Sequence, residues 1–180
     1  MGHRFAFAVC FATLAAALSL AGASAQTLRI VALGASNTAG MGRGPTNMGV
    51  PRHQAFPAQL ERLLRAQGHD ARVTNAGIAG DTTAGMLGRL SSAVPPATSV
   101  LILQPGGNDA RRGISDAQRQ ANIAEIQRRM QDRNIPVIVL HPFGAGLSQY
   151  RLADGQHFRA EGHAAVAARL LPQVLAAARR

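Results

Sequence analysis

Four short strand-like runs alternate with segments of helical periodicity, and this alternation limits the possible folds more than any other feature of the chain. The runs occupy residues 28–33, 71–75, 100–103 and 137–140. The first helical segment places Phe56, Leu60 and Leu64 on one face, because apolar residues recur there at helical spacing. Apolar strands separated by helices predict a buried parallel sheet with helices on both sides.

Three further segments are expected to be helical. Residues 82–90 form one of them, a longer helix begins at Ser115, and residues 160–178 form the last. The predicted architecture is an α/β domain over residues 26–180 with a flavodoxin-like parallel sheet. That sheet has four strands, or five if the segment before the last helix contributes one.

Three polar clusters accompany these elements, at residues 34–40, 106–109 and 154–157. Ser36 comes directly after the first strand-like run, and Asn108 comes directly after the third. The carboxyl ends of parallel strands meet at one edge of a sheet, so these two residues should lie close together. The third cluster precedes the last helix, and the usual crossover connections can return it to the same edge. We therefore expect one shared site there.

Ser36 is the candidate nucleophile of this site. It lies between two small residues in a glycine-rich loop, where an exposed hydroxyl can attack a carbonyl group. One alternative is a serine that caps a helix or stabilises a turn. A second is a phosphate-binding loop, but that loop needs a helix to start at once. Pro45 and Pro51 keep the chain irregular here, and a phosphate loop would leave Asp154 and His157 unexplained.

Asp154 and His157 form the candidate acid–base pair. Two residues separate them, so one turn can bring the carboxylate to Nδ1 of the imidazole and leave Nε2 facing the serine. The alternative is a structural histidine. His163 has an acid only at Glu161, whose spacing points the two side chains apart on a helix, so we expect His163 to pack or cap there. No acid–histidine grouping has metal-ligand spacing, and no metal site is predicted.

Two residues are candidate donors to an oxyanion. Asn108 carries two amide hydrogens and follows two glycines, although it could instead stabilise its own turn. Gly80 follows the second strand-like run, where a residue without Cβ lets a substrate approach the backbone N–H. Its alternative is a simple strand-to-helix turn. We expect Asp109 to serve a turn or a cap rather than catalysis.

Residues 1–25 read as a secretory signal peptide. A short basic start precedes an apolar run, and Ala23-Ser24-Ala25 is a cleavage site of the A-x-A type. The mature chain is then expected to begin at Gln26, without a membrane span, and to reside in the periplasm or outside the cell. An uncleaved membrane anchor is the alternative, although the apolar run is short for a span. The only cysteine, Cys10, lies in this segment, which excludes thiol chemistry from the mature protein.

The chain is strongly basic, with a formal net charge of +10, and all of its cationic side chains apart from histidine are arginines. Such a charge can indicate nucleic acid or an anionic surface as partner. The arginines are scattered, however, and the expected mature chain holds only Phe56, Phe143, Tyr150 and Phe158 as aromatics. These are too few for a base-stacking platform, so nucleic-acid binding is not expected.

Taken in order, the blocks around Ser36, Gly80, Asn108 and Asp154–His157 resemble the SGNH (GDSL-type) hydrolase family. The residues in these blocks are most similar to those of the family's bacterial thioesterase I, arylesterase and lysophospholipase branch. The resemblance implies a three-layer α/β/α fold and hydrolysis of ester or thioester bonds without a cofactor. It assigns the nucleophile to Ser36, the acid–base pair to Asp154 and His157, and the oxyanion hole to Ser36, Gly80 and Asn108.

Two features depart from this family's pattern. The usual Gly-Asp-Ser start reads Gly34-Ala35-Ser36, which removes no triad acid but loses side-chain hydrogen bonds of the nucleophile loop. Relatives usually place a helix and a fifth strand before the Asp-x-x-His block, whereas only residues 141–153 intervene here. The sheet is therefore expected to have four strands, and part of the pocket wall is expected to be missing.

The sequence as a whole predicts an exported, monomeric enzyme that acts on a small-molecule ester or thioester, with a lipid or an acetylated saccharide as the candidate substrates.

 
The acyl group is transferred to Ser36 and then to water, with no cofactor and no metal. One alternative within the enzymes is a carbohydrate O-acetyl esterase. The alternative from another class is a degenerate, non-catalytic binding module of the same fold, in which Ser36 and His157 lie too far apart for proton transfer. A nucleotide-binding flavodoxin-like protein is a weaker rival.

Overall fold

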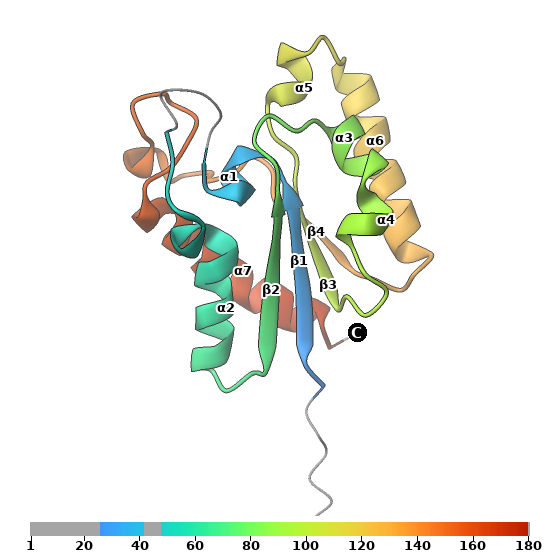
Figure 1. The fold of residues 1–180 in the computed structure, drawn as a ribbon, viewed down its shortest axis with the longest axis vertical. Coiled ribbons are helices and arrows are strands. Elements are labelled where there is room, and N and C mark those ends of the chain that lie inside the picture. The colour runs from blue at the N-terminus through green and yellow to red at the C-terminus, as the bar shows by residue number, and fades with distance from the viewer. Residues whose placement is uncertain (1–25, 42–47, 180) are drawn as a thin grey trace, which may run out of the picture.

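A four-stranded parallel sheet forms the centre of the protein (Figure 1). The structure is a computed structural model, and it describes residues 26–41 and 48–179. The predicted signal peptide, residues 1–25, lies outside this range and stays a prediction. The strands are β1 (Leu28–Gly34), β2 (Ala71–Gly77), β3 (Val100–Gln104) and β4 (Val137–Val139). Their order across the sheet is β2-β1-β3-β4, so the flavodoxin-like parallel sheet that the alternation predicts is confirmed.

Helices cover both faces of this sheet. On one face α2 packs against α7, and on the other lie α3, α4 and α6 (Figure 1). The helices in chain order are α1 (Ser36–Ala39), α2 (Phe56–Ala66), α3 (Thr83–Gly88), α4 (Leu90–Ala93), α5 (Asn108–Arg111), α6 (Asp116–Gln131) and α7 (Ala160–Ala177). Two short 3-10 helices, η1 (Arg52–Gln54) and η2 (Ser148–Tyr150), lie in the connections. The chain thus has three layers, as predicted.

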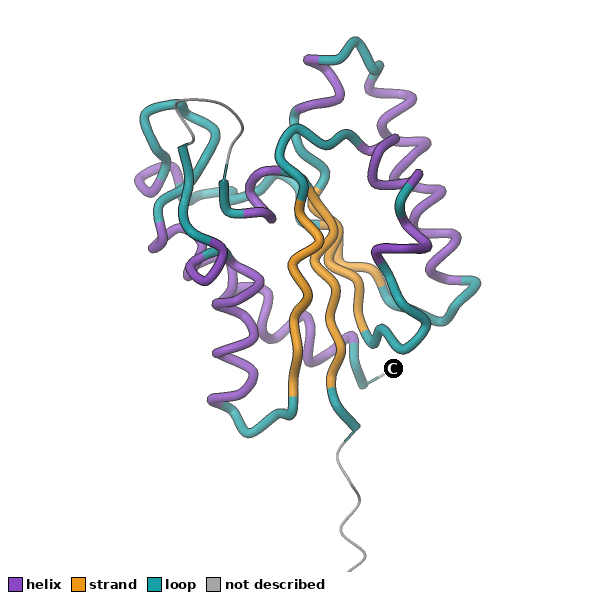
Figure 2. The backbone as a smooth tube through the Cα atoms, in the orientation of Figure 1, coloured by secondary structure: helices purple, strands orange, loops and turns teal. Residues whose placement is uncertain are grey.

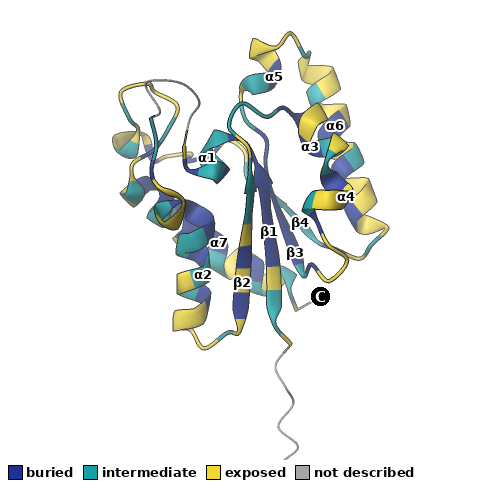
Figure 3. Cartoon of the chain, viewed as in Figure 1, coloured by how far each residue is buried: buried dark blue, intermediate teal, exposed yellow. Residues whose placement is uncertain are grey.

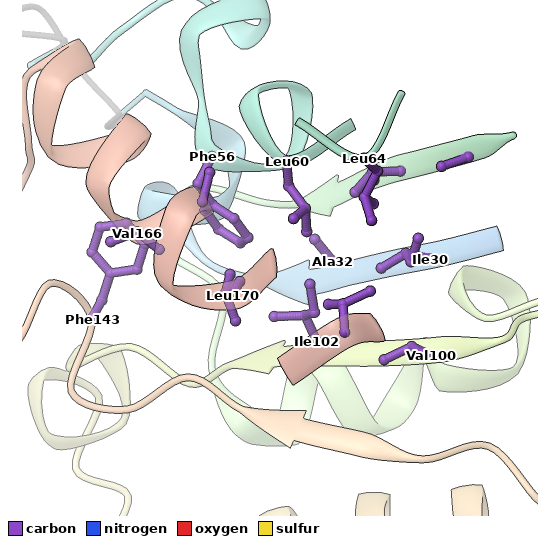
Figure 4. Packing of buried hydrophobic residues seen from close by; sticks show 14 of the residues in the cluster. Ile30, Ala32, Phe56, Leu60, Leu64, Val100, Ile102, Phe143, Val166 and Leu170 are labelled. Atoms are coloured by element: carbon purple, nitrogen blue, oxygen red, sulfur yellow. The ribbon is translucent and has the colours of Figure 1, made fainter. Parts of the chain in front are cut away.

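Alternating residues of β1 divide the core into two halves. Ile30 and Ala32 belong to the cluster beneath α2 and α7, whereas Val31 and Leu33 belong to the cluster beneath α3, α4 and α6. Successive side chains of a strand point to opposite faces, so a strand that is apolar throughout fills both halves. Figure 4 shows the first half, in which Ile30 and Ala32 face the α2 side chains. Figure 3 shows how completely the middle of the sheet is buried.

Strand β4 differs from the three strands before it. It is three residues long, lies at the sheet edge, and carries Val139, whose side chain is exposed. Residues 140–159 follow it without forming a fifth strand and contain only η2. The four-stranded alternative is therefore correct and the five-stranded one is wrong.

The helix expected over residues 82–90 is instead two short helices, α3 and α4, which meet at Arg89. Gly85 and Gly88 lie in α3, and glycine is a poor helix former, so little holds one continuous helix together. The guanidinium group of Arg89, at the break between the two helices, bonds Asp81 in the loop after β2 and Gly34 at the end of β1.

Over the described ranges, no helix combines the length and apolar character needed to cross a membrane.

The connections that follow β1, β2 and β3 gather at one end of the sheet, where Figure 2 colours them as loops. This is the carboxyl edge of the strands, and it holds Ser36, Gly80 and Asn108. The connection between β4 and α7 returns to the same end and brings Asp154 and His157 with it. The expected shared edge is therefore where the polar clusters lie.

Candidate active site

Ser36 is the first residue of α1 and lies directly beyond the end of β1. The turn between them is tight: a Cβ atom on Gly34 would lie 2.1 Å from the hydroxyl oxygen of Thr38. Glycine is therefore required at position 34 for the strand to pass directly into the helix. As the first helical residue, Ser36 has a backbone N–H without a carbonyl partner one turn earlier, so this N–H is free to bind an anion.

Ser36 lines a cleft of about 200 Å³. The cleft lies between the loop after β1, the loop after β3 and the long connection after β4. Its lining residues are Ala35, Ser36, Asn37, Gln104, Pro105, Gly106, Gly107, Asn108, Arg111, His141, Phe143, Arg151 and Gln156. The cleft therefore joins the nucleophile candidate to Asn108 and to the residue beside His157.

Gln104 holds the nucleophile loop in place. Its Oε1 atom accepts hydrogen bonds from the backbone N–H of Ala35, at 3.2 Å, and from the hydroxyl of Thr38, at 3.0 Å. The Gln104 side chain is buried at the end of β3, so these bonds connect two neighbouring strand ends in a dry environment. The sequence analysis missed this residue, although a glutamine that ends an otherwise apolar strand is a visible signal.

Asp154 and His157 meet as their spacing predicts. Nδ1 of His157 lies 2.5 Å from Oδ2 of Asp154, while Oδ1 of Asp154 accepts the backbone N–H groups of Gln156 and His157, both at 2.9 Å. Burial alone would raise the pKa of Asp154, but the bonds from the His157 ring and from these two amides lower it to about 2. The carboxylate is therefore ionised at neutral pH and orients the imidazole ring.

Nε2 of His157 is buried and has no hydrogen-bond partner among the described residues. No hydrogen bond between Ser36 and His157 occurs in this part of the chain either. The two are brought near each other by their neighbours, because the Asn37 side-chain amide donates to the Gln156 carbonyl oxygen at 3.2 Å. In unliganded sites a catalytic hydrogen bond is often long and shortens only when substrate is bound.

Asn108 is the first residue of α5 and lines the same cleft as Ser36. Its Nδ2 atom donates to the backbone carbonyl of Asp81 at 2.8 Å. An amide group has two N–H donors, so this bond fixes the side chain and leaves one hydrogen for a ligand in the cleft. The alternative in which Asn108 stabilises its own turn is not what the structure contains, since the bond reaches the loop after β2.

Gly80 lies in that loop with a backbone φ of +79°, a conformation that residues with a Cβ atom rarely adopt. It lines a neighbouring hollow with Ile78 and Arg112, and it is absent from the lining of the Ser36 cleft. The structure therefore brings Ser36 and Asn108 to one cleft and leaves Gly80 at its border. Gly80 is connected to the cleft through Asp81, the next residue, whose carbonyl holds Asn108.

Arg89 ties the loop after β2 to the end of β1, directly before Ser36. Its Nε atom donates to Oδ2 of Asp81 at 2.8 Å, and its Nη2 atom donates to the carbonyl oxygen of Gly34 at 3.2 Å. The Asp81 side chain is only 11% exposed, so the ion pair is partly shielded from water. Arg89 thus joins the two backbone segments that carry Ser36 and Gly80. Sequence reasoning missed it, because nothing local distinguishes it from the other arginines.

Two other polar residues have structural roles. The buried carboxylate of Asp109 accepts the backbone N–H of Thr83, the first residue of α3, which confirms the expected cap. On α7, Nδ1 of His163 accepts the backbone N–H of Phe56, the first residue of α2, at 3.2 Å. Burial, together with a smaller contribution from nearby His157, lowers the pKa of His163 to about 4. His163 is therefore a neutral capping residue.

The described residues include no group of three or more histidine, cysteine, aspartate or glutamate side chains that could hold a metal ion. The polar groups of the cleft are instead a hydroxyl, amides, guanidinium groups and the ring of His141. These groups suit nucleophilic attack and binding of negative charge.

Known proteins resemble this chain in both sequence and fold. The sequence model of the GDSL-like Lipase/Acylhydrolase family matches residues 32–174. Esterase TesA of Pseudomonas aeruginosa is 36% identical over 119 residues, which are 66% of this chain and 55% of that protein. The crystal structure of AlinE4, an SGNH-hydrolase family esterase, is 36% identical with a TM-score of 0.54, over 63% of this chain and 58% of that one.

A crystal structure of TesA matches over a longer range, with 26% identity and a TM-score of 0.67 across 84% of this chain and 99% of that chain. This chain spans only 55% of the length of esterase TesA from Pseudomonas aeruginosa and 58% of the length of the AlinE4 chain. The range that the family model matches, residues 32–174, includes the loops that carry Ser36 and Asn108 and the Asp154–His157 pair.

Proposed function

Because the chain belongs to the GDSL-like lipase/acylhydrolase family, we propose that it is an exported serine hydrolase that cleaves carboxylic ester or thioester bonds. The observation that carries the proposal is the ordered Asp154–His157 pair: its Nε2 atom is buried without a partner, and the adjacent residue, Gln156, is bonded to the helix that begins with Ser36. A buried imidazole nitrogen without a partner is costly to maintain in a purely structural role. It is well suited to accept a proton from a serine hydroxyl.

In the proposed reaction, Oγ of Ser36 attacks the carbonyl carbon of the substrate while Nε2 of His157 takes its proton. Asp154 keeps the ring in the tautomer that carries a proton on Nδ1 and stabilises the imidazolium ion as it forms. His157 then returns the proton to the leaving alcohol or thiol, which leaves an acyl group on Ser36. Water, activated by the same histidine, attacks this acyl-enzyme and releases the carboxylic acid.

The negative charge on the carbonyl oxygen of the intermediate needs hydrogen-bond donors. We assign this role to the backbone N–H groups of Ser36 and Gly80 and to the second amide hydrogen of Asn108. The Asp81 carbonyl fixes the Asn108 side chain before substrate arrives, so little reorganisation is needed during the reaction. Such preorganised donors usually make the largest single contribution to acyl-transfer catalysis.

The test compares wild-type protein with Ser36→Ala and with Ser91→Ala, an exposed serine outside the cleft. Wild-type protein and Ser91→Ala should hydrolyse a short p-nitrophenyl ester and be labelled by a fluorophosphonate, and Ser36→Ala should lose both properties. Full esterase activity in Ser36→Ala would contradict the proposal. Failure of the folded wild-type protein to react with either reagent would favour the non-catalytic binding module.

A carbohydrate O-acetyl esterase is the second candidate. The cleft is small, about 200 Å³, and polar residues form most of its lining, which favours short acyl groups over long hydrocarbon chains. A series of p-nitrophenyl esters from acetate to decanoate separates the candidates by kcat/KM. An optimum at acetate supports deacetylation. An optimum at the long-chain end of the series supports lipid or thioester deacylation.

Export and a monomeric state are further parts of the proposal. The sequence pattern of residues 1–25 supports export, and expression of the full chain in a bacterial host tests it. The intact mass of the protein recovered outside the cytoplasm should correspond to a chain that begins at Gln26. Light scattering of that protein should give the mass of one chain.

A further inference from the structure

Two guanidinium groups line the cleft beside Ser36. Arg111 reaches it from the end of α5, and Arg151 reaches it from the connection that follows η2. The apolar lining is limited to Ala35, Pro105 and Phe143. The cleft is thus a cationic surface around a nucleophile candidate rather than an apolar pocket.

Both arginines are held in place by neutral acceptors. Nη2 of Arg111 donates to Oε1 of Gln156 at 2.6 Å, and Nη1 of Arg151 donates to the carbonyl oxygen of Gly155 at 2.6 Å. The Arg151 guanidinium also lies 4.8 Å from the ring centre of Phe158, close enough for a cation–π contact. These contacts orient the side chains without cancelling their charge, and each guanidinium group keeps further N–H donors.

No acid among the described residues forms an ion pair with Arg111 or Arg151. Asp154, which lies in the same connection as Arg151, is paired with His157. His141 adds no charge at neutral pH, because burial and the nearby Arg119 lower its pKa and Nη2 of Arg119 lies 2.8 Å from its Nε2 atom. The two arginines therefore supply the positive charge of the cleft.

We propose that Arg111 and Arg151 form a subsite for an anionic group, a carboxylate or a phosphate, on the ester substrate. This inference rests on the proposed function, because it gives the substrate class of the same site. A guanidinium fork matches the geometry of both oxyanions and binds them through paired, charge-assisted hydrogen bonds. The subsite also accounts for a cleft that is polar where a lipid-specific enzyme would present apolar side chains.

The test compares pairs of esters that differ in charge. The mono-4-nitrophenyl ester of glutarate and 4-nitrophenyl valerate place the difference on the acyl side, and 4-acetoxybenzoate and phenyl acetate place it on the leaving-group side. We expect wild-type protein to prefer the anionic member of at least one pair by about tenfold in kcat/KM, mainly through KM. Raising the salt concentration to about 1 M should reduce this preference, because exposed charges are then screened.

Arg111→Gln and Arg151→Gln should each lower the preference several-fold, and the double variant should remove it. Both residues contact the loop that carries His157, so a loss common to both esters of a pair reports on that loop. Only the ratio between the esters reports on charge. Arg72→Gln removes the same charge from an exposed position on β2 outside the cleft, and it should keep the wild-type ratio.

Inorganic phosphate and glutarate are tested as competitive inhibitors, to distinguish a phosphate-binding subsite from a carboxylate-binding one. Inhibition that is lost in the double variant supports the subsite and identifies the preferred anion. An unchanged ester ratio in the double variant overturns the subsite proposal. Hydrolysis of both esters through Ser36 without any preference for the anion overturns this inference alone, whereas absence of Ser36-dependent hydrolysis overturns the proposed function.

Discussion

The two halves of the candidate site are supported in different ways. The half that holds Ser36 and Asn108 lies on short turns directly beyond the two buried strands β1 and β3, and Gln104, Arg89 and Asp81 bind these turns to one another or to the loop after β2. The half that holds Asp154 and His157 lies on a connection that is mostly exposed and follows the short edge strand β4 (Figure 3).

The second half reaches the first through few contacts. The Asn37 side chain bonds the Gln156 carbonyl, and Arg111 bonds the Gln156 side chain. A strand-end turn cannot move without moving the core, whereas an exposed loop opens at a lower free-energy cost. We conclude that the sheet determines the position of the nucleophile and the oxyanion donors, and that a few polar contacts at the surface determine the position of the base.

The largest expected effect comes from the base half. His157→Gln and Asp154→Asn should each lower kcat by roughly 10⁴-fold, because the serine loses its base or the base loses its orientation. Asp132→Asn, at the exposed residue that follows the end of α6, is the control for loss of a carboxylate and should keep wild-type activity. Steady-state kinetics on a p-nitrophenyl ester measure the difference, and unfolding curves check that each variant folds. A folded His157→Gln variant with near-normal kcat would assign the base elsewhere.

The oxyanion side should respond less strongly. Asn108→Ala removes the amide that lines the cleft and should lower kcat by about 10²- to 10³-fold. KM should change little if this donor acts mainly on the transition state. Asn122→Ala serves as the control for loss of a buried side-chain amide. Asn122 lies on α6, and its amide donates to the hydroxyl of Thr83, outside the cleft. If Asn108→Ala lowered only stability, Asn108 would be a structural residue.

Lowering the pH should reduce the free energy of unfolding first through His163, a buried histidine near His157. Burial, with His157 nearby, holds the pKa of His163 at about 4, whereas its ordinary value is 6.5. The unfolded chain therefore binds a proton that the folded chain does not, and the free energy of unfolding should fall as the pH drops from about 6.5 to about 4. The shift corresponds to roughly 3 kcal/mol.

Urea unfolding between pH 4 and pH 7 measures this dependence, with His163→Gln as the comparison. The amide can still accept the Phe56 N–H but does not titrate, so the variant should lack this part of the pH dependence. Below pH 4 both proteins should lose stability again as Asp154, whose pKa is lowered to about 2, becomes protonated. Identical curves above pH 4 would show that His163 is not responsible.

The smallest effect tests the connection between the halves. Asn37→Ala removes the bond to the Gln156 carbonyl and should lower kcat several-fold, with about 1 kcal/mol or less of lost stability. Gln173→Ala, which removes an exposed bond from a side-chain amide to a backbone carbonyl on α7, outside the Ser36 cleft, is the matched control. A loss in Asn37→Ala that matched the loss in His157→Gln would mean that this single bond determines the position of the base.

Much of the fold was predictable because its signals are local. Apolar runs predicted the strands to within a few residues, and periodicity predicted α2, α6 and α7. The family resemblance, inferred from blocks around Ser36, Asn108 and Asp154–His157, is confirmed by the family match. The Asp154–His157 contact was also predictable, because only one turn separates the two residues. The break between α3 and α4 was not predicted, since it depends on what Arg89 contacts elsewhere.

The sequence by itself determined the order of strands and helices and the residue types at each strand end, because periodicity and turn chemistry act over a few residues. The tertiary structure decided which distant groups support the site. Arg89 reaches a carbonyl 55 positions away, and Asn37 reaches one 119 positions away. It also decided that Arg111 and Arg151 line the cleft while Gly80 lies at its border. Such contacts depend on how whole elements pack, and no local pattern records them.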